Sequence, residues 1–371
     1  MLTLARKNLF KEKARLAISI GGVAFAVMLI VLLRGLYVAY ETKIGDFLEG
    51  MNVDSWVLQK GAANLIFSYS VLPASLGDRL EDIYGVKEAI PFTARQVGFK
   101  LNGKDVVMYV VGFNPDRRGS GPGPLRMDSG KRHIDDREII IDKVFAGKHG
   151  VDVGDTLTIN DEKLRVAGIS SGGDMVAFQY GFVTRSRARR LLDLHDTTTA
   201  FLLVYDENAP AAFIREQVQT IAPTLMVKSM PDMVKVNQRM VNKGFLPVLG
   251  VLVVIGFLIG VAVIGLTIYS AVLEHRREYG VLKAVGALTR QMLMVVAVQA
   301  MFSAVAGYAV GTAVSLLAAK GAEVWVPQFI TTITRTDLAI VGGVALLMGL
   351  IAAFVPLRTI ARVDPAVVFR A

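Results

Sequence analysis

Residues 274–287 read Glu-His-Arg-Arg-Glu-Tyr-Gly-Val-Leu-Lys-Ala-Val-Gly-Ala, and this charged segment lies between two long apolar runs. Basic side chains outnumber acidic ones in it and in the residues that follow, up to Arg290. Short loops that remain in the cytoplasm keep an excess of Lys and Arg. The segment is therefore expected to face the cytoplasm, where a soluble partner can reach it.

The composition favours membrane spans combined with one large polar domain. The chain has 371 residues, 53% of them hydrophobic, and a mean hydropathy of +0.47. Its four apolar runs are each long enough to cross a hydrocarbon layer of about 30 Å. A cleaved signal peptide is the rival interpretation of the first run, but such peptides have an apolar core of only about 7 to 15 residues.

The charge distribution orients these spans. Residues 41–244 contain 26 basic and 26 acidic side chains, whereas the tails and the segment 274–291 contain 12 basic and 4 acidic ones. The positive excess therefore marks the cytoplasmic side and attracts anionic lipid headgroups, and it predicts no nucleic-acid partner.

The predicted fold class is an α-helical membrane protein with four transmembrane helices and an α+β extracytoplasmic domain between the first and the second. Asn102-Gly103 and Asn160-Asp161 predict hairpin turns in that domain. The predicted order is a cytoplasmic amphipathic helix (1–15), the first span (16–40), the extracytoplasmic domain (41–244), the second span (245–273), a cytoplasmic loop (274–291), the third span (292–319), an outer loop (320–337), the fourth span (338–357) and a cytoplasmic C-terminal helix (358–371).

Small residues recur at four-residue spacing in three of the spans. They are Gly256 and Gly260 in the second, Ser303, Gly307, Gly311 and Ser315 in the third, and Ala345, Gly349 and Ala353 in the fourth. This spacing lets helix backbones approach closely in lipid, so these residues are predicted to pack helices together. The abundance of Gly and Ala in membrane helices is the alternative, and it explains any single pair more easily than the four residues of the third span.

Arg34 is the one ionisable residue inside the predicted spans, and it lies near the outer end of the first span beside Tyr37. A charge within a membrane is costly, which makes Arg34, with Tyr37, a candidate for substrate access. Snorkelling of Arg34 to the outer interface is the alternative, and the shallow depth of Arg34 favours it.

The sequence contains no motif that indicates a catalytic site or a metal site. The sequence contains no cysteine, and its four histidines are scattered without metal-ligand spacing, so neither a catalytic residue nor a metal site is assigned. No Gly-x-x-x-x-Gly-Lys-Ser/Thr, Gly-x-Ser-x-Gly or His-Glu-x-x-His occurs. If ATP drives this protein, a separate chain hydrolyses it.

The pattern Glu-x-Arg-Arg-Glu-Tyr-Gly-Val-Leu-Lys-Ala-Val-Gly-Ala resembles the signature of FtsX/MacB-like (type VII) ABC transporter permeases. The stretches 85–91 and 138–157 resemble the extracytoplasmic domain of MacB-like permeases, and Asp364-Pro365 resembles the terminal pattern of the family. Among subfamilies, the chain is most similar to the compact DevC/HrtB-like exporter permeases.

The resemblance implies the permease subunit of an ABC exporter, a non-enzyme in the bacterial cytoplasmic (inner) membrane. It implies two copies of the chain, a cytosolic ABC ATPase dimer that binds ATP and Mg²⁺, expulsion of a hydrophobic or amphipathic substrate, and an inserted subdomain at about 114–196; a periplasmic adaptor is left open. The residues implied to couple to the ATPase are Glu274, Arg276, Arg277, Glu278, Gly280, Val281, Leu282, Val285 and Gly286. The alternatives are a mechanotransmission subunit that regulates an extracytoplasmic partner without transport, and a membrane-anchored enzyme, which the missing motifs disfavour.

Overall fold

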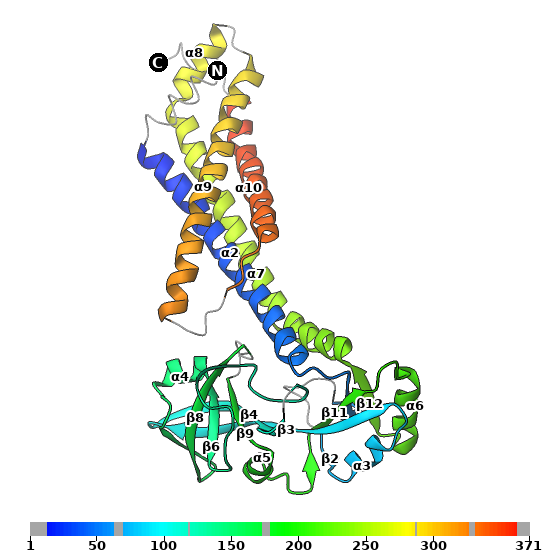
Figure 1. The fold of residues 1–371 in the computed structure, drawn as a ribbon. Coiled ribbons are helices and arrows are strands. Elements are labelled where there is room, and N and C mark those ends of the chain that lie inside the picture. The colour runs from blue at the N-terminus through cyan, green and yellow to red at the C-terminus, as the bar shows by residue number, and fades with distance from the viewer. Residues whose placement is uncertain are drawn as a thin grey trace. The chain divides into compact units, whose positions relative to one another are not determined.

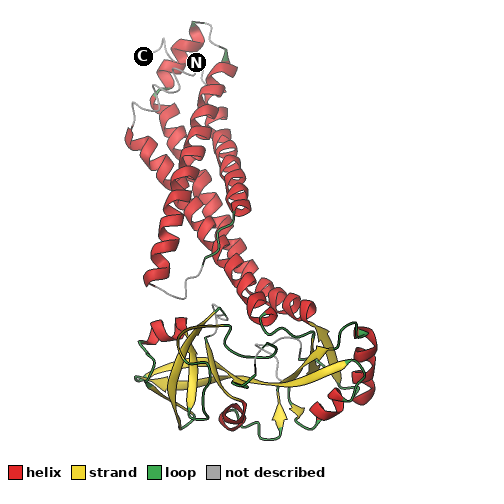
Figure 2. Cartoon of the chain, in the orientation of Figure 1, coloured by secondary structure: helices red, strands yellow, loops and turns green. Residues whose placement is uncertain are grey.

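The computed structural model describes residues 13–62, 70–117, 119–172, 179–285, 288–325 and 331–361. These residues form two compact units (Figure 1). The helical unit comprises the described residues up to Ala39 and from Phe245 onward, and the sheet unit comprises those in Tyr40–Gly244. In the described part, the helical unit has helices as its only regular structure, whereas the sheet unit combines strands with helices (Figure 2).

Long helices define the helical unit, although residues 40–49 and 230–244, at the ends of two of them, belong to the sheet unit. These helices are α2 (Lys13–Glu49), α7 (Met230–Glu274), α9 (Thr289–Trp325) and α10 (Arg335–Ala361), with the short α8 (Arg276–Ala284) after α7. The four long helices are also the candidate membrane spans found in the described residues, by length and apolar composition. The predicted fold class is therefore confirmed, with the sheet unit inserted between the first and second spans.

The helices extend beyond the apolar runs that predicted them. α7 begins at Met230, where the Ser229 hydroxyl donates to the Asp232 carboxylate at 2.7 Å and accepts from the Asp232 N–H at 3.3 Å. This capping starts the helix in a polar stretch, which hydropathy cannot detect. Of the predicted terminal helices, residues 1–12 and 362–371 lie outside the described part, and residues 358–361 continue α10.

Glycines bring the spans of the helical unit into close contact. A β-carbon on Gly311 of α9 would lie 2.6 Å from the Ala24 carbonyl oxygen and 2.9 Å from Val27 Cβ, both on α2. A β-carbon on Gly349 of α10 would lie 2.9 Å from Ala304 Cβ on α9. Because any side chain at these positions would collide with the facing helix, the glycines set the distance at which these helices pack.

A mixed sheet dominates the sheet unit, in the order β12-β1-β11-β3-β4-β9-β6-β8-β5, with β7 also paired to β8. The β4–β9 and β6–β8 pairs are parallel and the other pairs of this sheet are antiparallel. The strands are β1 (Ser55–Gln59), β3 (Val86–Leu101), β4 (Lys104–Phe113), β5 (Arg126–Gly130), β6 (Glu138–Asp142), β7 (Thr156–Ile159), β8 (Glu162–Ser171), β9 (Tyr180–Thr184), β11 (Ala200–Tyr205) and β12 (Leu225–Ser229), and a separate pair joins β2 (Leu72–Pro73) to β10 (Thr197–Thr198).

Four short helices complete the sheet unit. They are α3 (Leu76–Glu81), α4 (Lys143–His149), α5 (Arg185–Leu191) and α6 (Ala211–Ile221). α4 is capped by the Asp142 carboxylate, which accepts from the Val144 N–H at 2.7 Å, and α5 by the Thr184 hydroxyl, which accepts from the Arg187 N–H at 3.1 Å.

The long strand β3 joins the two halves of the sheet. Its first residues pair with β11 and its last residues, from Thr93, pair with β4. Trp56 and Phe92 meet edge to face at 4.9 Å in one core, while Phe99 and Phe145 lie in another. The second core contains residues of β3 and β4 that precede residue 114, so the inserted part is structurally continuous with strands outside the predicted range 114–196.

Both predicted hairpin turns are confirmed. Asn102-Gly103 connects β3 to β4 with φ angles of 52° and 77°, and Asn160-Asp161 connects β7 to β8 with φ angles of 48° and 64°. Two successive positive φ angles are typical of the type I′ turn, whose twist matches that of the flanking strands.

Candidate functional site

The segment predicted to meet an ATPase forms α8, a short helix that follows α7 almost directly. Arg276 and Arg277 are exposed, and they make no ion pair with any described residue. Val281 is 44% exposed and Val285 is 83% exposed. Large apolar side chains beside free positive charges form a surface suited to contact with another protein.

Two acidic residues of this segment have partners within the chain. The Arg15 guanidinium donates to the Glu274 carboxylate at 2.6 Å, and His275 Nδ1 lies 3.2 Å from the Glu278 carboxylate. The first contact ties the beginning of α2 to the end of α7, directly before α8. The carboxylates of Glu274 and Glu278 are both exposed. The Arg15–Glu274 contact is therefore a surface ion pair that contributes little to the free energy of folding.

The other predicted coupling residues are placed as follows. Gly280 is buried in α8, the side chain of Leu282 lies outside the described part, and so does Gly286. The coupling role of the whole set stays a prediction.

Arg34 has a partner that the sequence reasoning missed. Its Nε donates to Asp337 Oδ1 at 2.8 Å, and its guanidinium lies over the Tyr37 ring at 5.5 Å from the ring centre. The Asp337 side chain is only 5% exposed, so the pair is largely shielded from water on the Asp337 side. Substrate access through Arg34 and Tyr37 stays a prediction, and ion pairing with α10 is a further role for the arginine.

Asp337 also caps its own helix. The Thr334 hydroxyl donates to Asp337 Oδ2 at 2.6 Å, the Thr334 N–H donates to the same oxygen at 3.2 Å, and the Asp337 N–H donates to the Thr334 hydroxyl at 3.1 Å. This reciprocal arrangement is a capping box with the pattern Thr-x-x-Asp. The pattern stands directly before the fourth apolar run and could have revealed Asp337 from the sequence.

The predicted helix-packing residues contact other helices of the same chain where contacts are described. Gly307 and Gly311 face α2, while a β-carbon on Gly256 would lie 3.5 Å from Leu29 of α2. A β-carbon on Gly260 would lie 2.7 Å from the Met348 sulfur of α10. Ser303 and Ser315 are buried. The small-residue spacing thus has an intrachain use, and it does not by itself indicate a second copy of the chain.

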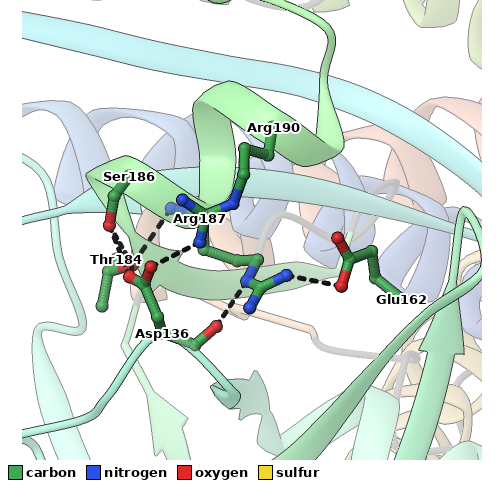
Figure 3. A network of polar contacts seen from close by, with 6 residues as sticks. All are labelled: Asp136, Glu162, Thr184, Ser186, Arg187 and Arg190. Carbon is green, nitrogen blue, oxygen red and sulfur yellow. Dashed lines mark hydrogen bonds and ion pairs between the residues drawn. The ribbon is translucent and has the colours of Figure 1, made fainter.

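In the sheet unit, Asp136 is the centre of a polar network that the sequence reasoning also missed (Figure 3). Its carboxylate accepts hydrogen bonds from the hydroxyls of Thr184 and Ser186 and from the Arg190 guanidinium. Its main-chain carbonyl accepts from Arg187 Nε, and Arg187 also donates to the Glu162 carboxylate at 2.5 Å. The hydrogen bonds from Ser186, Thr184 and Arg190 hold the pKa of Asp136 well below its usual value.

These contacts explain the arginine cluster at the start of α5. Arg187 and Arg190 pair with acidic groups, and Arg189 lies 3.5 Å from the Asp196 carboxylate. Burial lowers the pKa of Arg185, and the nearby charges of Arg117 and Arg189 lower it further. Most of the charges of this cluster are therefore paired within the sheet unit.

Two open hollows flank Asp136, with volumes of about 630 Å³ and 400 Å³. Their linings mix both signs of charge: Glu138 and Arg165 line the larger, and Asp116 and Arg185 the smaller. No group of three or more His, Asp or Glu side chains suited to a metal ion occurs among the described residues. The hollows are therefore not assigned a ligand.

The chain has the architecture of a multi-pass membrane subunit. It has four long apolar helices, a sheet unit of extracytoplasmic type between the first two, and an exposed amphipathic helix after the second. Residues 16–221 match the model of the MacB-like periplasmic core domain, and residues 250–365 match that of the FtsX-like permease C-terminal region. The chain belongs to the FtsX/MacB family of ABC transporter permeases. The resemblance found in the sequence is thereby confirmed.

Relatives match over nearly their whole length. Two uncharacterised ABC transporter permeases of Mycobacterium tuberculosis are 25% and 24% identical to the chain, each match covering 100% of this chain and 99% of the relative. An uncharacterised ABC transporter permease of Methanocaldococcus jannaschii is 23% identical, with 98% of this chain and 96% of the relative covered.

Two solved structures are similar to part of the chain. The periplasmic region of MacB from Actinobacillus actinomycetemcomitans has 11% identity and a TM-score of 0.37, covering 51% of this chain and 94% of that one. The extracellular domain of the transporter YknZ from Gram-positive bacteria has 12% identity and a TM-score of 0.34, covering 47% of this chain and 98% of that one.

Proposed function

We propose that this chain is the permease subunit of an export complex, in which cytosolic ATPase subunits act on the membrane helices through α8. The observation that carries the proposal is the exposed apolar surface of α8 and its C-cap, formed by Val281 and Val285 beside Arg276 and Arg277. Such a helix can place its valines in a groove of a partner while the arginines contact acidic groups around it. Because the sequence lacks a P-loop, ATP and Mg²⁺ belong to the partner.

The proposed assembly contains two copies of the chain and two ATPase subunits in the bacterial cytoplasmic membrane. Family membership supports a dedicated ATPase, and the charge distribution supports an outer sheet unit with both termini inside. The proposed substrate is a hydrophobic or amphipathic molecule taken from the membrane or from its outer side. Haem, lipid, lipopeptide, peptide and drug molecules are all compatible with this description.

The substitution Val281→Asp tests the contact with the ATPase. A charge buried in an apolar groove without a partner weakens association by about 3 kcal/mol or more. We expect the variant to insert normally, to co-purify at least about tenfold less ATPase and to lose stimulation of ATP hydrolysis. The matched control is Val153→Asp, since Val153 of the sheet unit is 43% exposed, against 44% for Val281. Full coupling of Val281→Asp would refute the assignment of α8.

Topology can be checked separately, because the chain has no cysteine of its own. An impermeant thiol reagent should label Ser129→Cys in intact cells and should label Arg276→Cys only after the membrane is opened. The reverse pattern would place α8 outside and exclude an encounter with a cytosolic ATPase.

The mechanotransmission alternative predicts a different combination of results. A complex that hydrolyses ATP through α8 but expels neither haem nor a fluorescent phospholipid from vesicles, and activates an extracytoplasmic hydrolase instead, would favour that role. Expulsion of either probe that depends on Val281 would favour export.

A further inference from the structure

The Arg34–Asp337 pair belongs to a larger junction between α2 and the start of α10. Asp337 uses one carboxylate oxygen for Arg34 and the other for the Thr334 cap. The same carboxylate therefore begins α10 and holds α2. Loss of either interaction would weaken the other, because the two oxygens share one rigid group.

Main-chain contacts reinforce the junction beside this carboxylate. The Thr332 N–H donates to the Gly35 carbonyl at 3.0 Å. A β-carbon on Gly35 would lie 3.0 Å from Ile333 Cγ1, so the two segments approach closely. The Tyr308 hydroxyl donates to the Leu338 carbonyl at 3.0 Å, which adds α9 to the same region. Parts of α2, α9 and α10 are thus held together at one end of the spans.

At the opposite end, α2 is held by a weaker polar contact. Arg15 pairs with Glu274 at 2.6 Å, but both side chains reach solvent and the Glu274 side chain is 61% exposed. Exposed ion pairs contribute about 0 to 1 kcal/mol, whereas separating a buried carboxylate from its partners is far more costly. The polar contacts therefore favour movement at the Arg15 end and resist it at the Arg34 end.

We propose that the Arg34–Asp337–Thr334 junction is a fixed pivot, which keeps α2 against the start of α10 throughout the transport cycle. Movement of the spans is then confined to their other ends, where α7 leads into α8. Arg34 and Asp337 act as positioning residues that transmit displacement of α8. This inference rests on the proposed coupling of α8 to an ATPase.

An engineered disulfide can test whether the junction stays closed. A β-carbon on Gly35 would lie 3.5 Å from Thr331 Cβ, within the range of about 3.5 to 4.5 Å found between the β-carbons of disulfides. The two-cysteine variant combines Gly35→Cys with Thr331→Cys, and no native thiol competes with them. Copper phenanthroline oxidises the two thiols to the disulfide, and dithiothreitol restores them.

The oxidised two-cysteine variant is expected to stimulate its ATPase as well as the reduced form does, because a pivot does not open. Each single-cysteine variant under the same oxidant is the control for oxidation itself. A reversible loss of stimulation on oxidation would mean that the junction has to separate during the cycle, and the proposal would be wrong.

A second arm tests the ion pair. Arg34→Met should lower ATPase stimulation at least about fivefold, the lower end of typical coupling between sites, whereas Arg34→Lys should retain most of it. The matched control is Arg335→Met, because Arg335 is exposed and makes no ion pair with a described residue. The disulfide should restore stimulation to Arg34→Met, since it replaces the lost attachment. An unaffected Arg34→Met, or a failure of this rescue, would show that Arg34 acts elsewhere.

If the proposed function is wrong, the result differs from the one expected when only the pivot is wrong. If the wild-type chain does not stimulate the ATPase, the assignment of α8 fails before any variant is compared. The junction is then tested without the ATPase, by the rate of disulfide formation in lipid vesicles. Arg34→Met should slow that rate at least about fivefold relative to Arg335→Met if the pair holds the two segments together. Equal rates would overturn the proposal.

Discussion

Asp136 in the sheet unit and Asp337 in the helical unit have similar partners but different surroundings. Each carboxylate accepts hydrogen bonds from a threonine hydroxyl and from an arginine distant in sequence. The Asp136 side chain is 41% exposed, whereas the Asp337 side chain is 5% exposed. Water can therefore replace the partners of Asp136 much more easily than those of Asp337.

The comparison shows that a count of hydrogen bonds does not measure their importance. An exposed carboxylate that loses its donors is hydrated, so its network mainly orients the segments around it. A buried carboxylate that loses its donors keeps the cost of desolvation without compensation. The four predictions below measure this difference, from the largest expected effect to the smallest.

Asp337→Ala should have the largest effect. It removes the partner of Arg34 and the carboxylate half of the capping box of α10 together, and we expect the helical unit to lose roughly 3 kcal/mol of stability. The apparent melting temperature of the full chain in detergent should fall by several degrees. Thr336→Ala is the control, because Thr336 is an exposed neighbour in the same turn. Equal melting of the two variants would show that the burial of Asp337 has no energetic consequence.

Asp136→Ala should have a smaller, local effect. It removes an exposed carboxylate that accepts hydrogen bonds from three side chains. We expect the free energy of local opening to fall by about 1 to 2 kcal/mol, which corresponds to roughly 5- to 30-fold faster amide exchange in β9 and α5. Asp196→Ala is the control, since the Asp196 carboxylate is fully exposed and lies 3.5 Å from the Arg189 guanidinium. A loss as large as that of Asp337→Ala would contradict the role assigned to exposure.

The network around Asp136 should also make the sheet unit sensitive to acid. The pKa of Asp136 is depressed in the folded state, chiefly by the hydrogen bond from Ser186. Its stabilisation is therefore complete above the unfolded pKa of about 3.9 and is lost as the pH falls further toward the folded value. The protection of the amides of β9 and α5, taken relative to the intrinsic exchange rate at each pH, should decrease between about pH 4 and pH 2 in the wild type, and less steeply in Asp136→Asn. Parallel curves would exclude Asp136 as the titrating group.

Asp128→Asn should have the smallest effect. The Asp128 carboxylate accepts from the Ser171 hydroxyl at 2.7 Å and lies 3.2 Å from Lys143 Nζ, and these contacts lower its pKa. They lie at the edge strand β5, and an asparagine can still accept the Ser171 hydrogen bond. We expect the free energy of local opening to change by less than about 1 kcal/mol, measured by amide hydrogen exchange in β5 and β8. A larger change would show that this edge network is as important as the one at Asp136.

Local sequence signals predicted several elements well. The β-rich run 55–59 and the helical spacing of residues 211–221 predict β1 and α6 with the bounds that the structure shows, and both hairpin turns occur where asparagine precedes Gly103 and Asp161. Each of these features depends on neighbouring residues, through strand propensity, helical spacing or tolerance of positive φ. The apolar strand β11 was missed although its composition is typical of a buried central strand.

The polar clusters were harder to predict, because their members are far apart in the sequence. Arg34 and Asp337 are separated by 303 positions, and Asp136 and Arg190 by 54. A capping pattern marks Asp337 as the start of a helix, but nothing near it indicates an arginine of the first span. The interpretation of Arg34 as a snorkelling side chain was reasonable from its depth, yet its partner came from another helix.

The sequence by itself determined the number of candidate spans, the insertion of a large domain between the first two, and the family. These properties depend on hydropathy, charge and short motifs, which are summed along the chain and do not require knowledge of contacts. Only the tertiary structure decided which helix each glycine faces, which carboxylate receives Arg34, and how the α5 arginines are neutralised. Hydrophobic burial is nondirectional, so an apolar helix can present any face to its neighbours. Close packing and hydrogen-bond geometry select one face, and both arise only when distant segments meet.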